Sequence, residues 1–257
     1  MPAPLIQFAS VSKRYAGQTA VDAVTLAIPA GQFVAVVGAS GSGKTTLTKM
    51  INRLVDPSSG QVLVEGEDVA TQDPVQLRRR IGYVFQGVGL FPHLTVAENI
   101  AITPRLLRWP DAGIIARVAE LLGLVDLPGS YADRRPDQLS GGERQRVGVA
   151  RALAAKPAIL LMDEPFGALD PITREALGRA TRDLHDRLAL TTVMVTHDVQ
   201  EALLLADRIL VMADGRLLAD ASPRELLKGH DDPAVAALID TPARQARALS
   251  ALMGADQ

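Results

Sequence analysis

Short apolar runs rich in β-branched residues alternate along this chain with segments in which apolar residues recur every three or four positions. This alternation predicts strand-helix-strand units and a mostly parallel sheet with helices on its faces. The strands expected from the apolar runs are LIQFASV (5–11), VTLAI (24–28), FVAVVG (33–38), QVLVEG (61–66), IGYVFQ (81–86), AILLMD (158–163), TTVMVTH (191–197) and DRILVMADG (207–215).

The helical periodicity predicts several helices and one inserted lobe. Helices are expected to begin at Lys44, Ala112, Gly141, Pro171 and Val199. Strand patterns stop at about residue 87 and helical periodicity continues to about residue 138, most clearly in TVAENIAI and IIARVAELLGL. We interpret residues 87–138 as an α-helical lobe inserted into an α/β core, with Pro128, Gly129 and Pro136 in the loops that return to the core.

Composition narrows the class of protein. The 257 residues are 47% hydrophobic and 22% charged, which is typical of a globular, water-soluble protein. The net charge is -2 with the cations spread along the chain, so no basic footprint for nucleic acid is expected. There is no cysteine, which excludes disulfides and thiolate metal sites. The first ten residues lack the pattern of a signal peptide and no apolar run approaches the roughly 18 residues of a membrane span, so we expect a cytoplasmic chain.

A phosphate-binding loop is the clearest chemical motif. Residues 38–46 read GASGSGKTT, which fits G-x-x-x-x-G-K-[ST] between the strand FVAVV and the helical segment LTKMINRL. In such a loop the amides turn toward phosphate, Lys44 reaches the β and γ oxygens, and the Thr45 hydroxyl can ligate Mg²⁺. The alternative, a glycine-rich turn without a ligand, is disfavoured by the two flanks. The expected nucleotide-binding residues are Gly38, Ala39, Ser40, Gly41, Ser42, Gly43, Lys44, Thr45 and Thr46.

Two carboxylates follow an apolar strand. Asp163 and Glu164 stand at its carboxyl end, the edge at which open α/β sheets bind ligands. Adjacent strand residues point to opposite sides, so Asp163 is expected to hold Mg²⁺ and Glu164 to orient and activate the attacking water. The alternative is a solvated strand end that carries two charges.

His197 and Gln86 also stand at strand ends. The imidazole of His197 can hydrogen-bond a γ-phosphate oxygen and hold the water and the base in register. Gln86 offers a neutral ligand that can complete a Mg²⁺ shell. A structural histidine and an idle loop glutamine remain the alternatives.

The segment LSGGERQRVGVARAL (139–153) predicts a helix with an unusual first turn. Ser140 and Glu143 form an S-x-x-E capping box, which satisfies free amides at the start of a helix. A capping box needs no glycine, and each glycine inside a helix costs roughly 1 kcal/mol against alanine. Gly141 and Gly142 therefore indicate that something approaches this backbone closely, and a helix N-terminus suits an anion such as phosphate.

Together these motifs resemble those of the ATP-binding cassette (ABC) ATPases. The phosphate loop, Gln86, LSGGERQ (139–145), ILLMDEP (159–165), ALD (168–170) and His197 occur in the order and spacing of that family, over about residues 6–227. The resemblance implies an α/β fold: a P-loop NTPase core with a mostly parallel central sheet, an antiparallel β portion near the N-terminus and an inserted α-helical lobe. It implies an ATPase domain over 1–229 and a short helical tail over 230–257.

The resemblance also implies roles for single residues. Tyr15 stacks on adenine, Glu164 and His197 are catalytic, and Thr45, Gln86 and Asp163 hold Mg²⁺. The signature residues Ser140, Gly141, Gly142 and Gln145 act in trans, on ATP held by the phosphate loop of a second subunit. Asp170 couples the two halves of an ATP-dependent homodimer. The expected ligands are thus ATP and Mg²⁺.

The resemblance favours the energy-supplying subunit of a membrane transporter. The other class, soluble ABC proteins of DNA repair or translation, carries long coiled-coil insertions or two tandem cassettes, which this sequence lacks. LFPHLTVAENI is similar to bacterial importers, and QGVG to the group that takes up glycine betaine, choline or carnitine. An importer of another small solute, such as an amino acid or polyamine, is the alternative.

Partners and location follow from the same resemblance. The expected partners are integral membrane permease subunits and, through them, an extracytoplasmic substrate-binding protein, with no nucleic acid. The chain is then a peripheral subunit on the cytoplasmic face of the inner (plasma) membrane.

Overall fold

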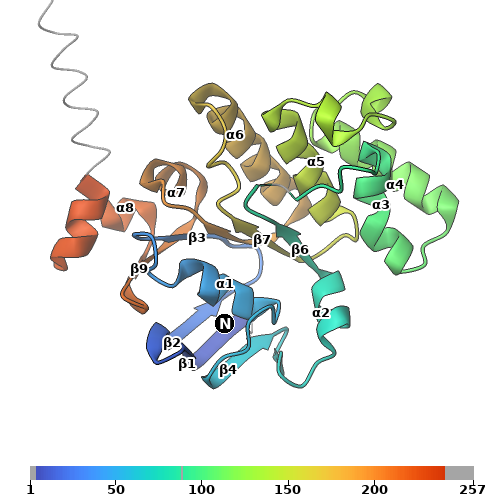
Figure 1. Cartoon of the computed structure of the whole chain (residues 1–257). Helices are drawn as coiled ribbons and strands as arrows, with labels where there is room; N and C mark the ends of the chain where they lie inside the picture. Colours follow the sequence, from blue (N-terminus) through green and yellow to red (C-terminus); the bar gives the residue numbers. More distant parts are fainter. Residues whose placement is uncertain (1–3, 88, 241–257) are drawn as a thin grey trace, which may run out of the picture.

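The computed structural model describes residues 4–87 and 89–240 (Figure 1). Near the N-terminus, β1 (Ile6–Tyr15), β2 (Gln18–Ile28), β4 (Ser59–Val64) and β5 (Glu67–Asp68) form an antiparallel sheet in the order β2-β1-β4-β5. The end of β2 alternates strictly, with Val24, Leu26 and Ile28 buried and the residues between them exposed. This period of two buries one face of the sheet, as expected for an antiparallel sheet.

The central sheet has six strands. Its members are β3 (Phe33–Val37), β6 (Ile81–Val84), β7 (Ile159–Asp163), β8 (Thr191–Val195), β9 (Arg208–Ala213) and β10 (Arg216–Ala221), in the order β10-β9-β3-β8-β7-β6. All neighbours pair in parallel except β10, which is antiparallel to β9. Every residue of β3, β7 and β8 is buried, which explains their continuous apolar runs. The expected P-loop core with a mostly parallel sheet and a separate antiparallel portion is confirmed.

Two hydrophobic cores lie on opposite faces of this sheet. One core joins Val34 and Val36 of β3 to α1 (Lys44–Ile51) and to the antiparallel sheet. The other joins Phe33, Ala35 and Val37 to α5 (Gly141–Leu153), α6 (Pro171–Leu188) and α7 (Val199–Leu205). In Figure 1, α1 accordingly lies below the central strands and α5, α6 and α7 lie above them.

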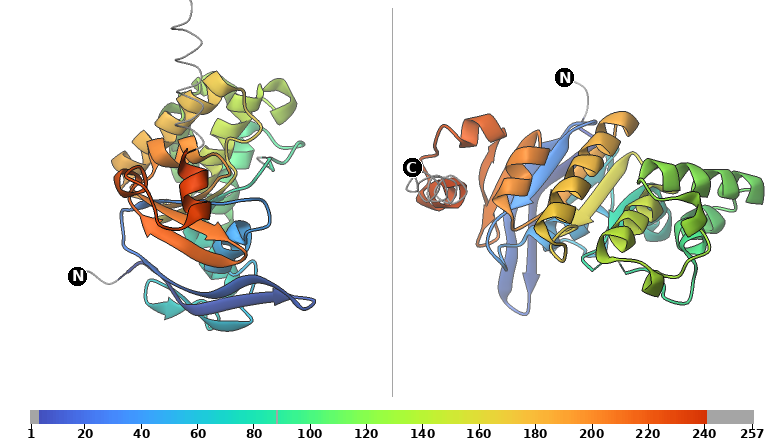
Figure 2. Two further views of the ribbon diagram at one scale, coloured as in Figure 1. Left: turned by 90° about the vertical axis from the view of Figure 1, so that its left-hand side faces the viewer. Right: turned by 90° about the horizontal axis from the view of Figure 1, so that it is seen from above.

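A group of helices separates β6 from β7 in the sequence. It comprises α3 (Val96–Leu106), α4 (Asp111–Leu124), the single turns Gly129–Tyr131 and Pro136–Gln138, and then α5. Figure 2 shows this group extending from one end of the sheet, away from α8 (Pro223–Leu226) at the other end. The helical insertion is therefore confirmed.

Four of the five expected helix starts are observed where they were predicted. The fifth helix, α4, begins one residue earlier, at Asp111. The apolar pattern did not predict α2 (Pro74–Arg80), because this helix buries only Leu77 and so shows no helical period. The strand β10 was not predicted either. It pairs with β9 through a tight turn at Asp214 and Gly215, both of which have positive φ. An Asp-Gly pair is a strong hairpin signal, and the pair was instead assigned to the end of the preceding strand.

Residues 233–240 are helical, while the remainder of the expected tail, 241–257, lies outside the described residues. Within the described part of the chain, no helix is both long enough and apolar enough to cross a membrane.

Candidate active site

The phosphate loop is closed tightly around its own lysine. Lys44 is 6% exposed, and its Nζ donates to the backbone oxygens of Gly38 (2.8 Å) and Ala39 (2.7 Å). Gly43 precedes α1 in the left-handed region with φ 100°, and a Cβ there would lie 2.2 Å from the backbone oxygen of Ala20. A side chain at residue 43 is excluded by both conformation and space. No side chain caps α1, so its first-turn amides remain open to a ligand.

Lys44 also faces the carboxylates predicted to serve the same site. Burial lowers the pKa of Lys44, and the negative charges of Glu164 and Asp163 oppose that shift. The Thr45 hydroxyl donates to Oδ1 of Asp163 (2.8 Å), although the two residues are 118 positions apart in the sequence. Tyr83 Oη donates to Oδ2 of Asp163 (3.4 Å), and burial, together with the Asp163 charge, raises the pKa of Tyr83. The phosphate loop and the end of β7 thus form one polar cluster.

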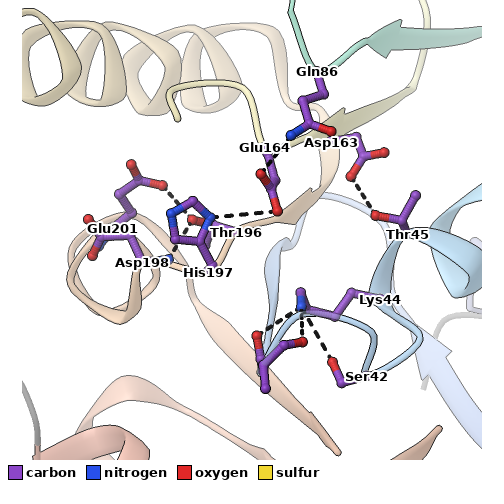
Figure 3. Close-up of polar contacts among 12 residues, drawn as sticks. Ser42, Lys44, Thr45, Gln86, Asp163, Glu164, Thr196, His197, Asp198 and Glu201 are labelled. Atoms are coloured by element: carbon purple, nitrogen blue, oxygen red, sulfur yellow. Dashed lines mark hydrogen bonds and ion pairs between the residues drawn. The ribbon is translucent and has the colours of Figure 1, made fainter. Parts of the chain in front are cut away.

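Glu164 lies between two further predicted residues (Figure 3). Gln86 Nε2 donates to Oε2 of Glu164 (2.9 Å), and His197 Nδ1 lies 3.6 Å from Oε1. The backbone of Glu164 has φ 44°, and its N–H donates to the oxygen of Val195 at the end of β8. Leaving the strand direction turns the carboxylate away from Asp163 and toward His197, so the two acidic residues have different neighbours, as the sequence analysis expected.

Residues on either side of His197 are fixed by contacts that the sequence analysis did not predict. Thr196 Oγ1 donates to Oε2 of Glu201 (2.7 Å), and Asp198 N donates to Thr196 Oγ1 (3.0 Å). Burial raises the pKa of Glu201, opposed mainly by the Thr196 hydrogen bond. The segment THDVQE (196–201) contains a signal for these contacts, because Asp198 can cap the helix that contains Glu201. Figure 3 shows Glu201 and Asp198 to the left of the imidazole and Thr196 overlapped by it.

The first turn of α5 has the capping box that was predicted. Glu143 N donates to Ser140 Oγ (3.3 Å), and Ser140 N donates to Oε2 of Glu143 (2.7 Å). Tyr131 Oη donates to Oε1 of Glu143 (2.9 Å). These hydrogen bonds, those to Ser140 first, lower the pKa of Glu143. The box orients the start of α5 while leaving Ser140 exposed.

The two glycines that follow Ser140 differ in their surroundings. A Cβ at Gly142 would lie 2.6 Å from Thr173 Cγ2, in the first turn of α6. Packing between α5 and α6 therefore disfavours any side chain at residue 142 unless Thr173 shifts. At Gly141 the nearest atom, Leu169 Cδ2, would lie 3.7 Å away, an ordinary contact distance. Packing inside this chain explains Gly142 and leaves Gly141 unexplained.

Gln145 is unlike the other signature residues because it is buried, 3% exposed. Its Nε2 has no hydrogen-bond partner within the described part of the chain. It lines a cavity of about 410 Å³ together with Gly141, Gln86, Glu164 and His197. The residues of the phosphate loop do not line this cavity. One side of the signature helix thus borders the expected base of its own chain.

Two predicted residues lie at the margins of this arrangement. Tyr15 ends β1 with its ring 46% exposed and Lys13 Nζ 4.9 Å from the ring centroid, so a face of the ring is accessible for stacking. Asp170 caps α6, accepting from the N–H of Thr173 (3.0 Å). Their roles toward adenine and toward a second subunit stay predictions.

The structure thus brings most predicted residues into one region, and Gly141 and Gln145 border that region through the cavity that they share with Glu164 and His197. Lys44, Thr45, Asp163, Glu164 and His197 meet at the carboxyl ends of β3, β7 and β8. The helices α1 and α5 cover opposite faces of the central sheet.

Comparisons with known proteins agree with these motifs and this fold. A family model described as ABC transporter matches residues 21–167, more than half of the chain. The glycine betaine/carnitine/choline transport ATP-binding protein OpuCA of Bacillus subtilis (strain 168) is 51% identical over 225 residues, which are 87% of this chain and 59% of that protein. The glycine betaine uptake system ATP-binding protein YehX of Escherichia coli (strain K12) is 48% identical over 223 residues, 87% of this chain and 72% of that protein.

Solved structures of cassettes are similar as well. The dimeric post-hydrolysis state of the ATP-binding cassette MJ0796 bound to ADP and Pi superposes with a TM-score of 0.77 at 33% identity, covering 85% of this chain and 99% of that one. The chain spans less than two thirds of the length of OpuCA, and a larger share of YehX and of the solved cassette. By sequence and by fold, the chain belongs to the ABC transporter family.

Proposed function

We propose that this chain binds ATP and hydrolyses it to drive a membrane importer. The observation that carries the proposal is the convergence of Lys44, Thr45, Asp163, Glu164 and His197 at one sheet edge. A buried cation, a hydroxyl-carboxylate pair and a second carboxylate beside an imidazole are the groups that phosphoryl transfer to water requires.

The residues present fit a Mg²⁺ ion that arrives with its nucleotide. Among the described residues no cluster of three or more histidine, cysteine or acidic side chains suits a metal. Mg²⁺ at nucleotide sites is held by one or two carboxylates with phosphate oxygens and water, which suits the pair of Thr45 and Asp163. When bound, Mg²⁺ would neutralise charge on the phosphates. Gln86, whose Nε2 donates to Glu164 here, is proposed as a further ligand through its amide oxygen.

In the proposed reaction each side chain has a separate task. Lys44 leaves the loop oxygens of Gly38 and Ala39 and binds the β and γ phosphates, where its charge favours their anionic form. Glu164 orients the attacking water and accepts its proton, a role worth about 10² to 10⁴ in rate. His197 contacts the Glu164 carboxylate through Nδ1 and is proposed to hydrogen-bond the γ-phosphate, which fixes the two groups relative to each other. Tyr15 is proposed to stack on adenine with its exposed face.

The placement of α5 supports a site shared between two chains. The helices α1 and α5 cover opposite faces of one sheet, and the cavity that Gly141 and Gln145 line includes no residue of the phosphate loop of the same chain. A two-fold dimer makes the contact reciprocal, so that each loop meets the partner's α5. We propose that Ser140, Gly141 and Gly142 close over the γ-phosphate in trans, that Gln145 supports them, and that Asp170 couples the halves.

The relatives support a transport role with a substrate class. OpuCA and YehX are named for transport or uptake of glycine betaine, and OpuCA also for carnitine and choline. We propose uptake of a quaternary-amine osmoprotectant, with integral membrane permease subunits and an extracytoplasmic binding protein as partners. The chain would act peripherally on the cytoplasmic face of the inner membrane. We also propose the division into an ATPase domain over 1–229 and a tail over 230–257.

Two measurements test the proposal. Steady-state ATP hydrolysis should fall about 10²-fold or more in Glu164→Gln and stay unchanged in the control Glu175→Gln, whose exposed carboxylate pairs with Arg179 on α6. Equal rates in all three proteins would refute the site assignment. For the transport role, the tagged chain should copurify with an integral membrane protein, and Glu164→Gln should stop glycine betaine uptake. Recovery of DNA or ribosomes instead would favour a soluble ABC protein.

A further inference from the structure

Arg174, in the first turn of α6, connects two segments that border the active site. Its Nη2 donates to the backbone oxygen of Leu169 (3.0 Å), in the segment that precedes α6. Its Nη1 lies 3.4 Å from Oδ2 of Asp198, and its Nε lies 3.7 Å from Oε1 of Glu201. The planar guanidinium can make such contacts in several directions at once, which a lysine cannot. One side chain thus joins the segment before α6 to the first turn of α7.

The two carboxylates that Arg174 meets also fix the backbone around His197. Asp198 caps α7 by accepting from the N–H of Gln200 (2.8 Å), while Glu201 accepts from Thr196 Oγ1 (2.7 Å). His197 itself is 61% exposed in its side chain, and its Nδ1 lies 3.6 Å from Oε1 of Glu164, beyond ordinary hydrogen-bond distance. Thr196 and Asp198, which flank the imidazole in the sequence, are therefore held by these contacts (Figure 3), and Arg174 contacts both Asp198 and Glu201.

The charges around Arg174 explain why its loss would displace this segment. Asp198 and Glu201 are side by side in one helical turn, and the Glu201 side chain is only 11% exposed. Without Arg174 two carboxylates would face each other with no cation between them, and burial strengthens their repulsion. Within the described part of the chain the buried Nε of Arg174 makes no hydrogen bond, and Oε1 of Glu201 lies 3.7 Å from it.

We propose that Arg174 is a positioning residue for hydrolysis: it holds His197 against Glu164 and transmits displacements of the Leu169–Asp170 segment to the imidazole. This inference rests on the proposed function. It adds a role that the motifs do not contain, because Arg174 lies beyond ALD and touches none of the groups expected to meet ATP.

A matched control lies two turns along the same helix. Arg182 is 28% exposed in its side chain, against 29% for Arg174. Arg182 also joins α6 to the α7 region, donating to the oxygen of Leu205 (2.9 Å) and to Oδ1 of Asp207 (2.8 Å). Its contacts are at the far end of α7 from His197. Arg182 additionally pairs with Asp186 and lies over the Phe33 ring, so its truncation removes at least as many interactions as that of Arg174. A larger loss of activity in Arg174→Ala would therefore not follow from lost contacts alone.

The test compares the full-length wild type, Arg174→Ala, Arg174→Lys and Arg182→Ala. We expect kcat of Arg174→Ala to fall roughly ten- to a hundredfold, as misplaced catalytic groups do, with ATP affinity unchanged within about twofold. Arg174→Lys should retain part of the rate, and Arg182→Ala should retain nearly all of it. In ¹⁵N spectra of the imidazoles, the His197 signals, assigned with His197→Ala, should move in Arg174→Ala and not in Arg182→Ala.

The outcomes separate this inference from the proposed function. If wild type hydrolyses no ATP, the proposed function fails, yet the His197 signals still report whether Arg174 positions the ring. Unchanged kcat and unchanged His197 signals in Arg174→Ala would overturn the inference. If kcat fell equally in Arg174→Ala and Arg182→Ala and in proportion to the loss of stability, Arg174 would only stabilise the packing of the helices, and the inference would be overturned. Should Arg174→Ala fail to fold, Glu201→Gln, which keeps an acceptor for Thr196, gives the same readouts.

Discussion

The helices α1 and α5 both have glycine at or next to their first residue, and their first turns are built in opposite ways. The N-cap of α1 is Gly43 in the left-handed region, with no side-chain cap, so the chain leaves its first amides open. The N-cap of α5 is Ser140 in extended conformation, within a complete capping box. Two other helices, α3 and α8, have the same kind of box without glycine, in TVAE and SPRE.

The comparison separates two uses of glycine. At Gly43 the backbone conformation and the nearby oxygen of Ala20 both require it. At Gly142 the neighbouring helix α6 leaves little room for a side chain, and at Gly141 no described residue would lie closer than an ordinary contact distance. The first helix start is therefore prepared by its own chain to receive phosphate. The second is capped by its own side chains, and we propose that Gly141 serves a contact with a second chain.

The largest expected effect concerns the start of α1. Lys44→Ala removes the buried cation at the phosphates, so ATP binding should be lost, as measured by equilibrium dialysis or a fluorescent nucleotide. Lys49→Ala, on the same helix and outside the site, is the control and should bind normally. ATP affinity of wild-type strength in Lys44→Ala would refute the assignment of the loop.

At the start of α5 the expected defect is different in kind. Ser140→Arg places a bulky side chain on the surface proposed to meet the partner's ATP, so binding should persist while hydrolysis stops. Ser222→Arg alters the equivalent capping box of α8, away from the site, and should hydrolyse normally apart from a loss of stability of about 1 kcal/mol. Normal hydrolysis by Ser140→Arg would contradict the shared site.

The glycine pair gives a finer test. Gly142→Ala should lower the free energy of unfolding by about 1 to 3 kcal/mol, because the new methyl group overpacks against Thr173. Gly141→Ala should leave stability unchanged or slightly raised and yet slow hydrolysis. Urea unfolding and steady-state kinetics measure the two effects. If Gly141→Ala hydrolysed ATP at the wild-type rate, glycine at residue 141 would have no functional meaning.

The smallest expected effect is the pH dependence of the α5 cap. The pKa of Glu143 is lower in the folded protein than its usual value of 4.5, chiefly through hydrogen bonds from Ser140. The resulting stabilisation is present at pH values above the usual pKa of 4.5. It is lost as the pH falls through the lower pKa that Glu143 has in the folded protein. Urea unfolding should therefore show a shallower loss of stability in acid for Glu143→Gln than for wild type. Parallel curves would show that the carboxylate adds nothing to the cap.

Much of the site could be predicted because its chemistry is local in the sequence. The phosphate loop, the carboxylates after β7 and the α5 cap each depend on residues within a single turn or strand end. Their convergence followed from one rule, that parallel strands present their carboxyl ends at one edge. The pairing of Thr45 with Asp163 confirms that rule for this chain.

The features that escaped prediction depend on packing between distant segments. The contact of Gly142 with Thr173 exists only because α5 packs on α6, and the contacts of Arg174 require α6 beside α7. No local pattern encodes either. The helix α2 escaped for another reason, since it buries a single leucine, although Asp73 and Pro74 form a good N-terminal signal.

The most direct test of the account is the mass of Glu164→Gln in solution, measured by light scattering with and without ATP. The substitution keeps the shape of the side chain and removes the base, so bound ATP should persist. The account predicts a monomer that becomes a dimer only with ATP, and no dimer when Ser140→Arg is added. A monomer that binds ATP and stays monomeric would contradict the claim that the start of α5 completes the site of a second chain.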